Sequence, residues 1–322
     1  MVVVSTGGTI ASRVDRERDV VTSAASGAEL VDHMAGPAGV DVAVDEFVMV
    51  GSFLFDLDLV FRLTRRIAGH LADDAVAGVV VTQGTDTMEE SAYMADLLVA
   101  SDKPVVFTGA QRHADEPDSD GPRNLGDAVR VAAAPAARGL GATIVFEQEI
   151  HAARDATKVH AARVGTFASG EHGKLGEVDG EAVIVHRRPT LRRTFAAERI
   201  EPRVDLVKLV MGSDGRFIDH AVADGAKAIV VEAFGRGNAT LAVVDAVRRA
   251  SERGVLVAVT TRCPQGRVLP VYGDGGGKDL VAAGAAFAGD LSGVKARILL
   301  SVLLADDRPR AEIVDLLTEL AG

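Results

Sequence analysis

The sequence lacks the features that mark several common classes of protein. Its 322 residues include no tryptophan and one cysteine, Cys263, and aromatic residues make up only 4%. One cysteine excludes an intramolecular disulfide and a zinc site with several cysteine ligands. The shortage of aromatic side chains leaves no stacking platform for single-stranded nucleic acid.

Clusters of positive charge and long apolar runs are also missing. The formal net charge is −11, and the 35 lysines and arginines are scattered, which disfavours contact with nucleic acid or an anionic membrane. No run of 18 apolar residues occurs, and no basic and apolar leader precedes the first strand. We therefore predict a cytoplasmic protein without a membrane span.

Metal-ligand patterns are absent too. The eight histidines are dispersed, without an HExxH pair or a histidine–carboxylate cluster, so we predict no metal site. Cys263 has no nearby histidine to activate it, which favours an incidental cysteine over a catalytic nucleophile.

The chain is long enough, and at 48% apolar residues rich enough, for two domains with separate cores. Strands alternating with helices predict an α/β fold: a larger N-terminal doubly wound sheet domain plus a smaller C-terminal α/β domain. We expect the N-terminal domain at 1–185, a linker at 186–204 and the C-terminal domain at 205–322. The expected strands are 2–4, 46–50, 79–81, 104–107, 143–146, 206–210, 228–231 and 255–259. The expected helices are 28–35, 56–71, 125–134, 214–224, 241–252, 293–304 and 308–320, with one more from Met88.

The turn after residues 79–81 carries an unusual density of polar groups, TQGTDT at 82–87. Ligands of open α/β sheets bind beyond the carboxyl ends of the strands, where this turn lies. Thr87 and Glu90 form a capping box for the following helix, but one cap uses only part of the polar set. Gly84 suggests a sharp turn or a close approach. The turn is therefore either a helix start alone or a functional loop.

The first strand ends in a similar turn, STGGTIAS at 5–12. Gly7 and Gly8 allow close approach to a ligand, and the Thr9 hydroxyl is left to face the crevice. Neither GxGxxG nor GxxxxGK[ST] is present, which disfavours a phosphate loop. Residues 13–26 are polar, without clear periodicity, and are expected to form a mobile lid.

These residues permit acyl transfer. A threonine hydroxyl is a nucleophile only when a base removes its proton. Lys158 is the one lysine between Lys103 and Lys174, and a desolvated lysine steered by Asp86 could be that base. Backbone N–H groups around Gly8 and Gly84 could stabilise an oxyanion.

Several segments resemble the bacterial-type L-asparaginase/glutaminase family over nearly the full length. They are TGGTIAS (6–12), VTQGTDTMEESA (81–92), KPVVFTGAQR (103–112), DGPRNL (120–125), RDATK (154–158), FGRGN (234–238) and KARILL (295–300). The resemblance implies hydrolysis of L-asparagine to L-aspartate and ammonia through a threonine acyl-enzyme, without metal or cofactor.

The resemblance also assigns roles to particular residues. The nucleophile falls on Thr9, and the proton relay on Thr85, Lys158 and Asp86. By the same resemblance, Ser52 binds the substrate's α-carboxylate, Asp86 binds its α-amino group, and Gly84 is a further substrate-binding residue. The family's homodimers and homotetramers place the C-terminal domain of one subunit at its neighbour's site, where the neighbour would supply Asn238.

Three positions depart from the family pattern. The lid usually carries a tyrosine, but the tyrosines here are Tyr93 and Tyr272. The segment 273–277, which should supply a glutamate, is glycine-rich, with Asp274 and Asp279 nearby. The usual histidine of the second motif is Gln83.

Two alternatives stay open beside an asparaginase. The glutaminase subunit of a tRNA-dependent amidotransferase shares TIASRVD at 9–15, although such subunits carry an additional N-terminal domain that we do not expect here. A non-catalytic amino-acid-binding relative would explain the missing tyrosine and glutamate. Asparagine and glutamine differ by one methylene, so the choice between them also stays open.

Overall fold

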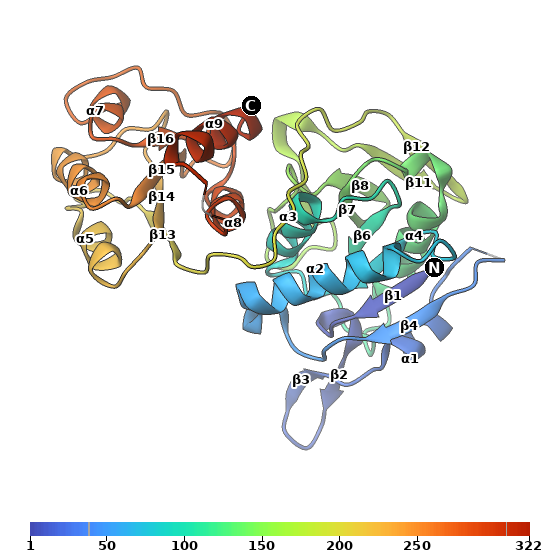
Figure 1. Ribbon diagram of the computed structural model, residues 1–322. Helices are drawn as coiled ribbons and strands as arrows, with labels where there is room; N and C mark the ends of the chain where they lie inside the picture. The colour runs from blue at the N-terminus through green and yellow to red at the C-terminus, as the bar shows by residue number, and fades with distance from the viewer. Residues whose placement is uncertain (38, 307) are drawn as a thin grey trace. The chain divides into compact units, whose positions relative to one another are not determined.

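The computed structural model describes residues 1–37, 39–306 and 308–322. The chain forms two compact units, Met1–Phe195 and Ala196–Gly322, coloured blue to yellow and yellow to red in Figure 1. The division falls inside residues 186–204. The predicted fold class is confirmed, because a larger α/β unit precedes a smaller one.

The N-terminal unit is built on an eight-stranded sheet in the order β12-β11-β8-β7-β6-β5-β1-β4. Its strands are β1 (Val2–Ser5), β4 (Ala43–Glu46), β5 (Val79–Thr82), β6 (Val105–Thr108), β7 (Ala142–Phe146), β8 (Glu149–Ala152), β11 (Gly176–Asp179) and β12 (Ala182–Val185). The run from β4 to β7 is parallel, and β8, β11 and β12 continue it as antiparallel strands. The four central parallel strands are buried along their whole length, as apolar strands covered on both faces should be.

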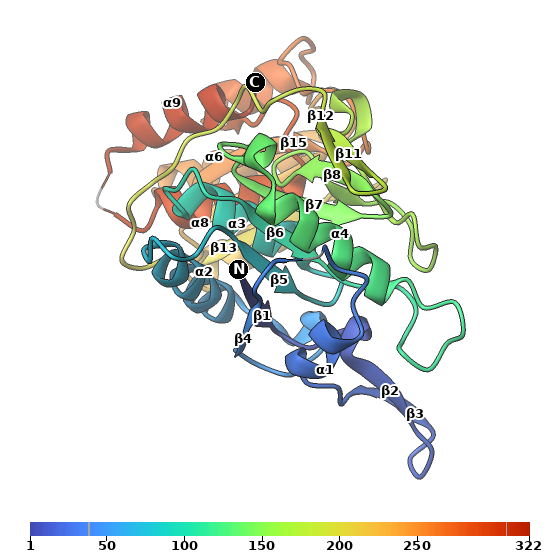
Figure 2. The ribbon, with the colours of Figure 1, turned by 90° about the vertical axis from the view of Figure 1, so that its right-hand side faces the viewer.

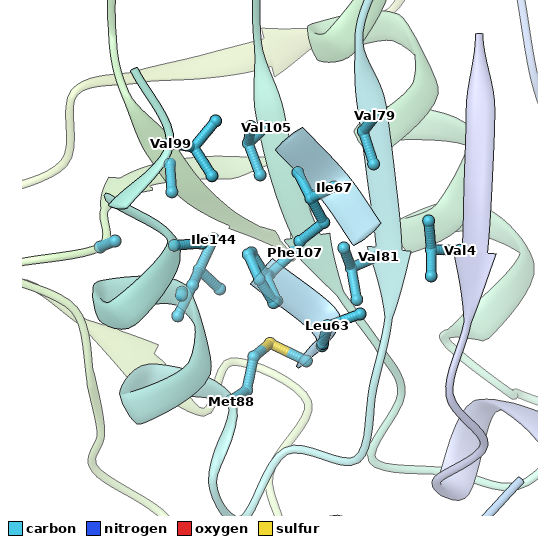
Figure 3. Close-up of a cluster of buried hydrophobic side chains, with 14 of the residues drawn as sticks. Val4, Leu63, Ile67, Val79, Val81, Met88, Val99, Val105, Phe107 and Ile144 are labelled. Atoms are coloured by element: carbon cyan, nitrogen blue, oxygen red, sulfur yellow. The ribbon is translucent and has the colours of Figure 1, made fainter. Parts of the chain in front are cut away.

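Helices cover both faces of this sheet. They are α1 (Gly27–Asp32), α2 (Leu57–Leu71), α3 (Met88–Leu98) and α4 (Gly121–Ala133). Leu63 and Ile67 of α2 and Met88 of α3 pack on the side chains of β5 and β6, around the fully buried Phe107 (Figure 3). Residues of α1 and α4 belong to the cluster on the opposite face. Asp56 accepts a hydrogen bond from Leu59 N at 2.7 Å and so begins α2 where the sequence predicts.

The C-terminal unit has a four-stranded parallel sheet in the order β13-β14-β15-β16. Its strands are β13 (Val204–Lys208), β14 (Ala228–Ala233), β15 (Leu256–Thr261) and β16 (Ala286–Phe287). Its helices are α5 (Arg216–Ala223), α6 (Leu241–Glu252), α7 (Gly277–Ala282), α8 (Gly293–Leu303) and α9 (Arg310–Leu320). The sequence predicts most of these elements but not β16 or α7.

Two of the secondary-structure predictions for the N-terminal unit are wrong. The strand expected at 46–50 is β4 (Ala43–Glu46), which pairs with β1 in the register Val2↔Ala43. The irregular loop expected at 13–26 contains an antiparallel hairpin, β2 (Ser12–Asp15) and β3 (Val20–Ser23). Figure 2 shows this hairpin extending away from the body of the N-terminal unit. A further short pair, β9 (Thr157–Lys158) and β10 (Phe167–Ala168), holds the region of Lys158.

No helix among the described residues is both long and apolar enough to cross a membrane.

Candidate active site

The two polar turns lie side by side because they follow neighbouring strands. Strands β1 and β5 are parallel and in register, so both turns leave the sheet at the same edge. Thr6 joins them, since its N–H and its hydroxyl both donate to the carbonyl of Thr82, at 3.1 and 2.8 Å. The geometry thus places Thr9 and Thr85 on adjacent loops.

Glycine makes the close packing of these loops possible. Gly7 and Gly8 have φ of +88° and +81°, which side chains disfavour. A Cβ atom on Gly8 would lie 2.3 Å from Gly84 N, and one on Gly84 would lie 2.7 Å from Ser52 Oγ. Three turns therefore meet almost backbone to backbone, and any larger residue would push them apart.

A cleft of about 580 Å³ opens where the three turns meet. Its lining includes every site residue that the sequence predicts for the N-terminal unit: Thr9, Ser52, Gly84, Thr85, Asp86 and Lys158. Asn238 lies in the C-terminal unit, where its backbone forms a two-way bridge with Phe234. The volume lies in the range of small-molecule sites.

Lys158 is fixed at the wall of the cleft by three contacts. Its Nζ donates to Thr85 Oγ1 at 2.8 Å and to Asp86 Oδ1 at 2.7 Å, and its N–H donates to Glu89 Oε1 at 3.2 Å. The side chain of Lys158 is 15% exposed, whereas that of Asp86 is 56% exposed. Asp86 therefore faces the open cleft while it pairs with the lysine.

Thr9 is held less closely. It is the first residue of a 3₁₀ turn, Thr9–Ala11, and is half-buried at the cleft. Its hydroxyl makes no hydrogen bond within the described residues. The N–H of the preceding Gly8 donates to Ser23 Oγ at 3.1 Å, which occupies one of the two expected oxyanion donors. The N–H of Gly84 forms no hydrogen bond within the same part of the chain.

Buried polar atoms with unused hydrogen-bonding capacity lie beside the cleft. Ser52 Oγ and Gln111 Nε2 have no partner among the described residues, although both atoms are inaccessible to solvent. Both residues line the cleft. Unpaired buried polar atoms are costly, so a polar ligand that satisfies them would be stabilised.

Four polar residues that the sequence pattern does not single out also line the cleft: Ser12, Thr22, Ser23 and Gln111. Gln111 follows β6, the next parallel strand along the sheet, so the rule that finds Thr85 could have found it too. Thr22 and Ser23 depend on the β2–β3 hairpin, which the sequence pattern does not predict.

The departures from the family pattern persist in three dimensions. Tyr93 is buried in α3, 2% exposed, and Tyr272 lies in the C-terminal unit, so neither is on the hairpin. Asp279, one of the two acids near the glycine-rich segment, accepts a hydrogen bond from Gly275 N of that segment at 2.7 Å.

The described residues hold no group of three or more His, Cys, Asp or Glu side chains that could bind a metal.

Comparison with known proteins agrees with this geometry. Residues 1–191 match the family model "Asparaginase, N-terminal", and residues 203–317 match "Glutaminase/Asparaginase C-terminal domain". An L-asparaginase of Bacillus licheniformis is 35% identical over 303 residues, 94% of each chain. A probable L-asparaginase of Deinococcus radiodurans is 36% identical over 329 residues, 99% of this chain and 97% of that protein.

A relative with a different name is a glutamyl-tRNA(Gln) amidotransferase subunit of Methanosarcina acetivorans. It is 32% identical over 295 residues, 88% of this chain and 69% of that protein. The fold and the family matches together define an α/β enzyme of the amidohydrolase class. The chain belongs to the asparaginase family.

Proposed function

We propose that this protein hydrolyses L-asparagine to L-aspartate and ammonia through an acyl-enzyme on Thr9. The observation that carries the proposal is the 2.8 Å hydrogen bond from Lys158 Nζ to Thr85 Oγ1, in a cleft that Thr9 also lines. A lysine bonded to a hydroxyl and steered by a carboxylate provides a path for a proton, which an amide-cleaving threonine needs.

In the proposed mechanism, Thr9 Oγ1 attacks the side-chain amide carbon, and its proton passes to the relay of Thr85 and Lys158. The tetrahedral oxyanion is stabilised by backbone N–H groups, with Gly84 as a candidate donor. The carbon–nitrogen bond breaks, and the relay returns the proton to the nitrogen, which leaves as ammonia. Water then attacks the ester, its proton passes through the same relay to Thr9, and aspartate is released.

Substrate binding follows from charge and hydrogen-bonding capacity. The exposed carboxylate of Asp86 suits the α-ammonium group of an amino acid. The unpaired Ser52 Oγ, together with the backbone at Gly84, suits the α-carboxylate. The two anchors together favour a free α-amino acid over a simple amide.

We also propose that the site is completed in a homodimer or homotetramer by the partner subunit's Asn238. Large apolar side chains are exposed beside the cleft, including Phe53 at 71%, and on the C-terminal unit, including Met211 at 96%. Each has an exposed apolar neighbour in the chain, Leu54 at 64% and Val210 at 58%, and contiguous exposed apolar patches commonly mark a contact surface. Mixing Thr9→Ala and Asn238→Ala subunits after mild dissociation should restore activity if sites are shared between subunits. Lack of any recovery would contradict a shared site.

Ammonia release from L-asparagine and L-glutamine, measured in steady state, tests the activity. We expect turnover of asparagine, and its loss in Thr9→Ala and Lys158→Ala. One methylene in a pocket changes kcat/KM by about 10- to 200-fold, so the two amides should be clearly separated. Full activity in Thr9→Ala would remove the proposed nucleophile.

A second candidate is the glutaminase subunit of a tRNA-dependent amidotransferase, favoured by the similarity to the amidotransferase subunit of Methanosarcina acetivorans. Activity that depends on a co-purifying partner protein would support it.

A non-catalytic amino-acid-binding protein is the third candidate, favoured by the missing tyrosine. It would bind L-aspartate without any turnover of asparagine. The cytoplasmic location stays a prediction, which fractionation of cells would test.

A further inference from the structure

We propose that Gln83 and Thr87 are positioning residues that fix Ser52 through a directional chain of hydrogen bonds. This inference rests on the proposed function, because Ser52 is assigned there to the substrate's α-carboxylate. The chain starts below the cleft at the fully buried Gln83 and ends at the backbone of Ser52.

Thr87 does not have the role that its sequence position suggests. It precedes α3, but its side chain makes no capping hydrogen bond, so the predicted capping box is wrong for this residue. Instead, Thr87 Oγ1 donates to the carbonyl oxygen of Ser52 at 2.9 Å, across 35 residues of sequence. The hydroxyl therefore ties the second polar turn to the turn that carries Ser52.

The Ser52 carbonyl, which can only accept, determines the direction of the chain, and Gln83 supplies its other end. Gln83 Nε2 donates to Ser91 Oγ at 2.9 Å and to Thr87 Oγ1 at 3.4 Å. Since the single proton of Thr87 is donated to Ser52, its oxygen must accept from Gln83, and the amide nitrogen must face it. Each link thus has one possible donor: Gln83 to Thr87, and Thr87 to Ser52.

The chain leaves the Ser52 hydroxyl for a ligand. The Ser52 carbonyl accepts from Thr87 and from Phe55 N, at 2.9 and 3.0 Å, which holds the backbone of this residue. Its Oγ is buried without a partner among the described residues, packed over Gly84, where a Cβ atom would come within 2.7 Å. Loss of the Thr87 hydroxyl would let the turn move and misplace that oxygen. Thr87 would therefore affect substrate binding without touching substrate.

The test replaces Thr87 by valine, which keeps the branched shape and removes the hydroxyl. We expect KM for L-asparagine and Kd for L-aspartate, measured by calorimetry, to rise about five- to tenfold, the effect of one neutral hydrogen bond. We expect kcat to stay within about twofold, because the relay of Thr85 and Lys158 is unchanged. Thr87→Ser, which keeps the hydroxyl, should restore both constants.

The matched control is Thr64→Val. Thr64 is also a threonine whose hydroxyl donates to a carbonyl, that of Val60 at 2.9 Å, but it is buried on α2 and does not line the cleft. If the loss of any such hydrogen bond raised KM by making the whole N-terminal unit less rigid, Thr64→Val would raise KM as much as Thr87→Val. We expect KM in Thr64→Val to equal that of the wild type.

Gln83→Glu gives a second, independent readout. A protonated Glu can donate to Thr87 as the amide does, whereas an ionised one attracts the Thr87 proton away from Ser52. KM of this variant should rise with pH relative to the wild type, whereas a loss of side-chain packing alone would raise KM equally at every pH.

Wild-type KM and Kd in Thr87→Val, with no added pH dependence in Gln83→Glu, would overturn the inference. Failure of the proposed function would appear separately, as a wild-type protein that releases no ammonia from asparagine. The aspartate-binding measurements would then decide the inference alone.

Discussion

The two halves of the cleft are built differently. On one side, Thr85, Asp86 and Lys158 are joined by hydrogen bonds of 2.7 and 2.8 Å, and Thr85 is only 4% exposed. On the other side, Thr9 lies half-buried, with no hydrogen bond to its hydroxyl among the described residues. The proposed proton relay is thus held together by hydrogen bonds within the chain, whereas the hydroxyl of the proposed nucleophile is not.

The hairpin explains part of this difference. Strands β2 and β3 follow Thr9 directly and expose Val20 and Val21 at 42% and 52%. The side chain of Ser23, at the end of β3, links the hairpin to the glycine turn through Gly8. We infer that the substrate, together with a neighbouring subunit, completes the ordering around Thr9. Catalytic hydrogen bonds that tighten only in the substrate complex are common in enzymes.

Thr9→Ala should have the largest effect, since it removes the attacking oxygen itself. We expect kcat for L-asparagine to fall by at least about 10⁴-fold, as for the nucleophile of a covalent mechanism. The matched control is Thr22→Ala, which removes a hydroxyl from the same side of the cleft and should cost far less. Comparable losses in the two variants would argue that Thr9 only lines the site.

Lys158→Met should have the next largest effect. It removes the amine that contacts Thr85 and Asp86 while keeping much of the buried stem, and kcat should fall by about 10²- to 10⁴-fold. Lys158→Arg should not rescue the rate, because a guanidinium retains its proton at any working pH. An active arginine variant would show that charge alone, and no proton transfer, is needed at this position.

Asp86→Asn tests the residue that the proposal uses both to bind substrate and to orient Lys158. It removes the charge proposed to bind the α-ammonium group but retains the shape of the side chain. We expect KM to rise about 10- to 100-fold, the range of one to two charge-assisted hydrogen bonds. Succinamic acid, which lacks the α-amino group, should be a poor substrate of the wild type. Its KM should change little in Asp86→Asn, because it has no ammonium group for the Asp86 carboxylate to bind. A larger loss for succinamic acid than for asparagine in Asp86→Asn would place the amino group elsewhere.

The smallest effect concerns the stability of the segment that carries Lys158. His151 on β8 is bonded to Ser169 Oγ at 2.8 Å, and Ser169 follows β10, which pairs with Lys158. Burial lowers the pKa of His151 below its usual 6.5, reinforced by Lys174 and Arg187 and opposed by Glu149. The folded state therefore favours the neutral imidazole.

Its contribution to stability has a definite sign. The contribution of His151 to the free energy of unfolding should be fully present above pH 6.5. It should decrease as the pH falls from there towards the folded-state pKa, because the unfolded chain binds the extra proton. Urea unfolding at pH 7.5 and 5.5 measures this, and His151→Gln should reduce the difference. An unchanged pH dependence in that variant would exclude His151 as its source.

The half of the cleft that carries Thr85, Asp86 and Lys158 could be predicted from sequence far better than the half that carries Thr9. QGTD follows β5, which begins with three valines, and precedes a clear helix, so Thr85 and Asp86 are placed by local pattern alone. The position of β4 could not be predicted, because the apolar residues after Glu46 resemble a strand although pairing with β1 ends at Glu46. Contacts between distant residues, such as Thr87 with Ser52, have no local signal at all.

The antiparallel edge of the sheet did have a signal. Strands β11 and β12 are joined at Gly180, with φ of +58°, after Asp179. The two-residue loop is Gly180-Glu181, and glycine at the first position of such a loop is typical of a hairpin turn, so this pair was predictable from the sequence. The β2–β3 hairpin lacks such a dipeptide and turns through Arg16 to Asp19, where Asp15 Oδ1 accepts from two backbone N–H groups.

The different roles proposed for the two halves of the cleft, with Thr9 as the nucleophile and Thr85 in the relay, are tested most directly by trapping the covalent intermediate. The protein is mixed with L-asparagine, quenched in acid within milliseconds, digested and analysed by mass spectrometry. We predict that the mass of one aspartyl group is added to the peptide that contains Thr9, and to no other. An adduct on the peptide that contains Thr85, or rapid turnover without any adduct in burst-phase samples, would contradict the account.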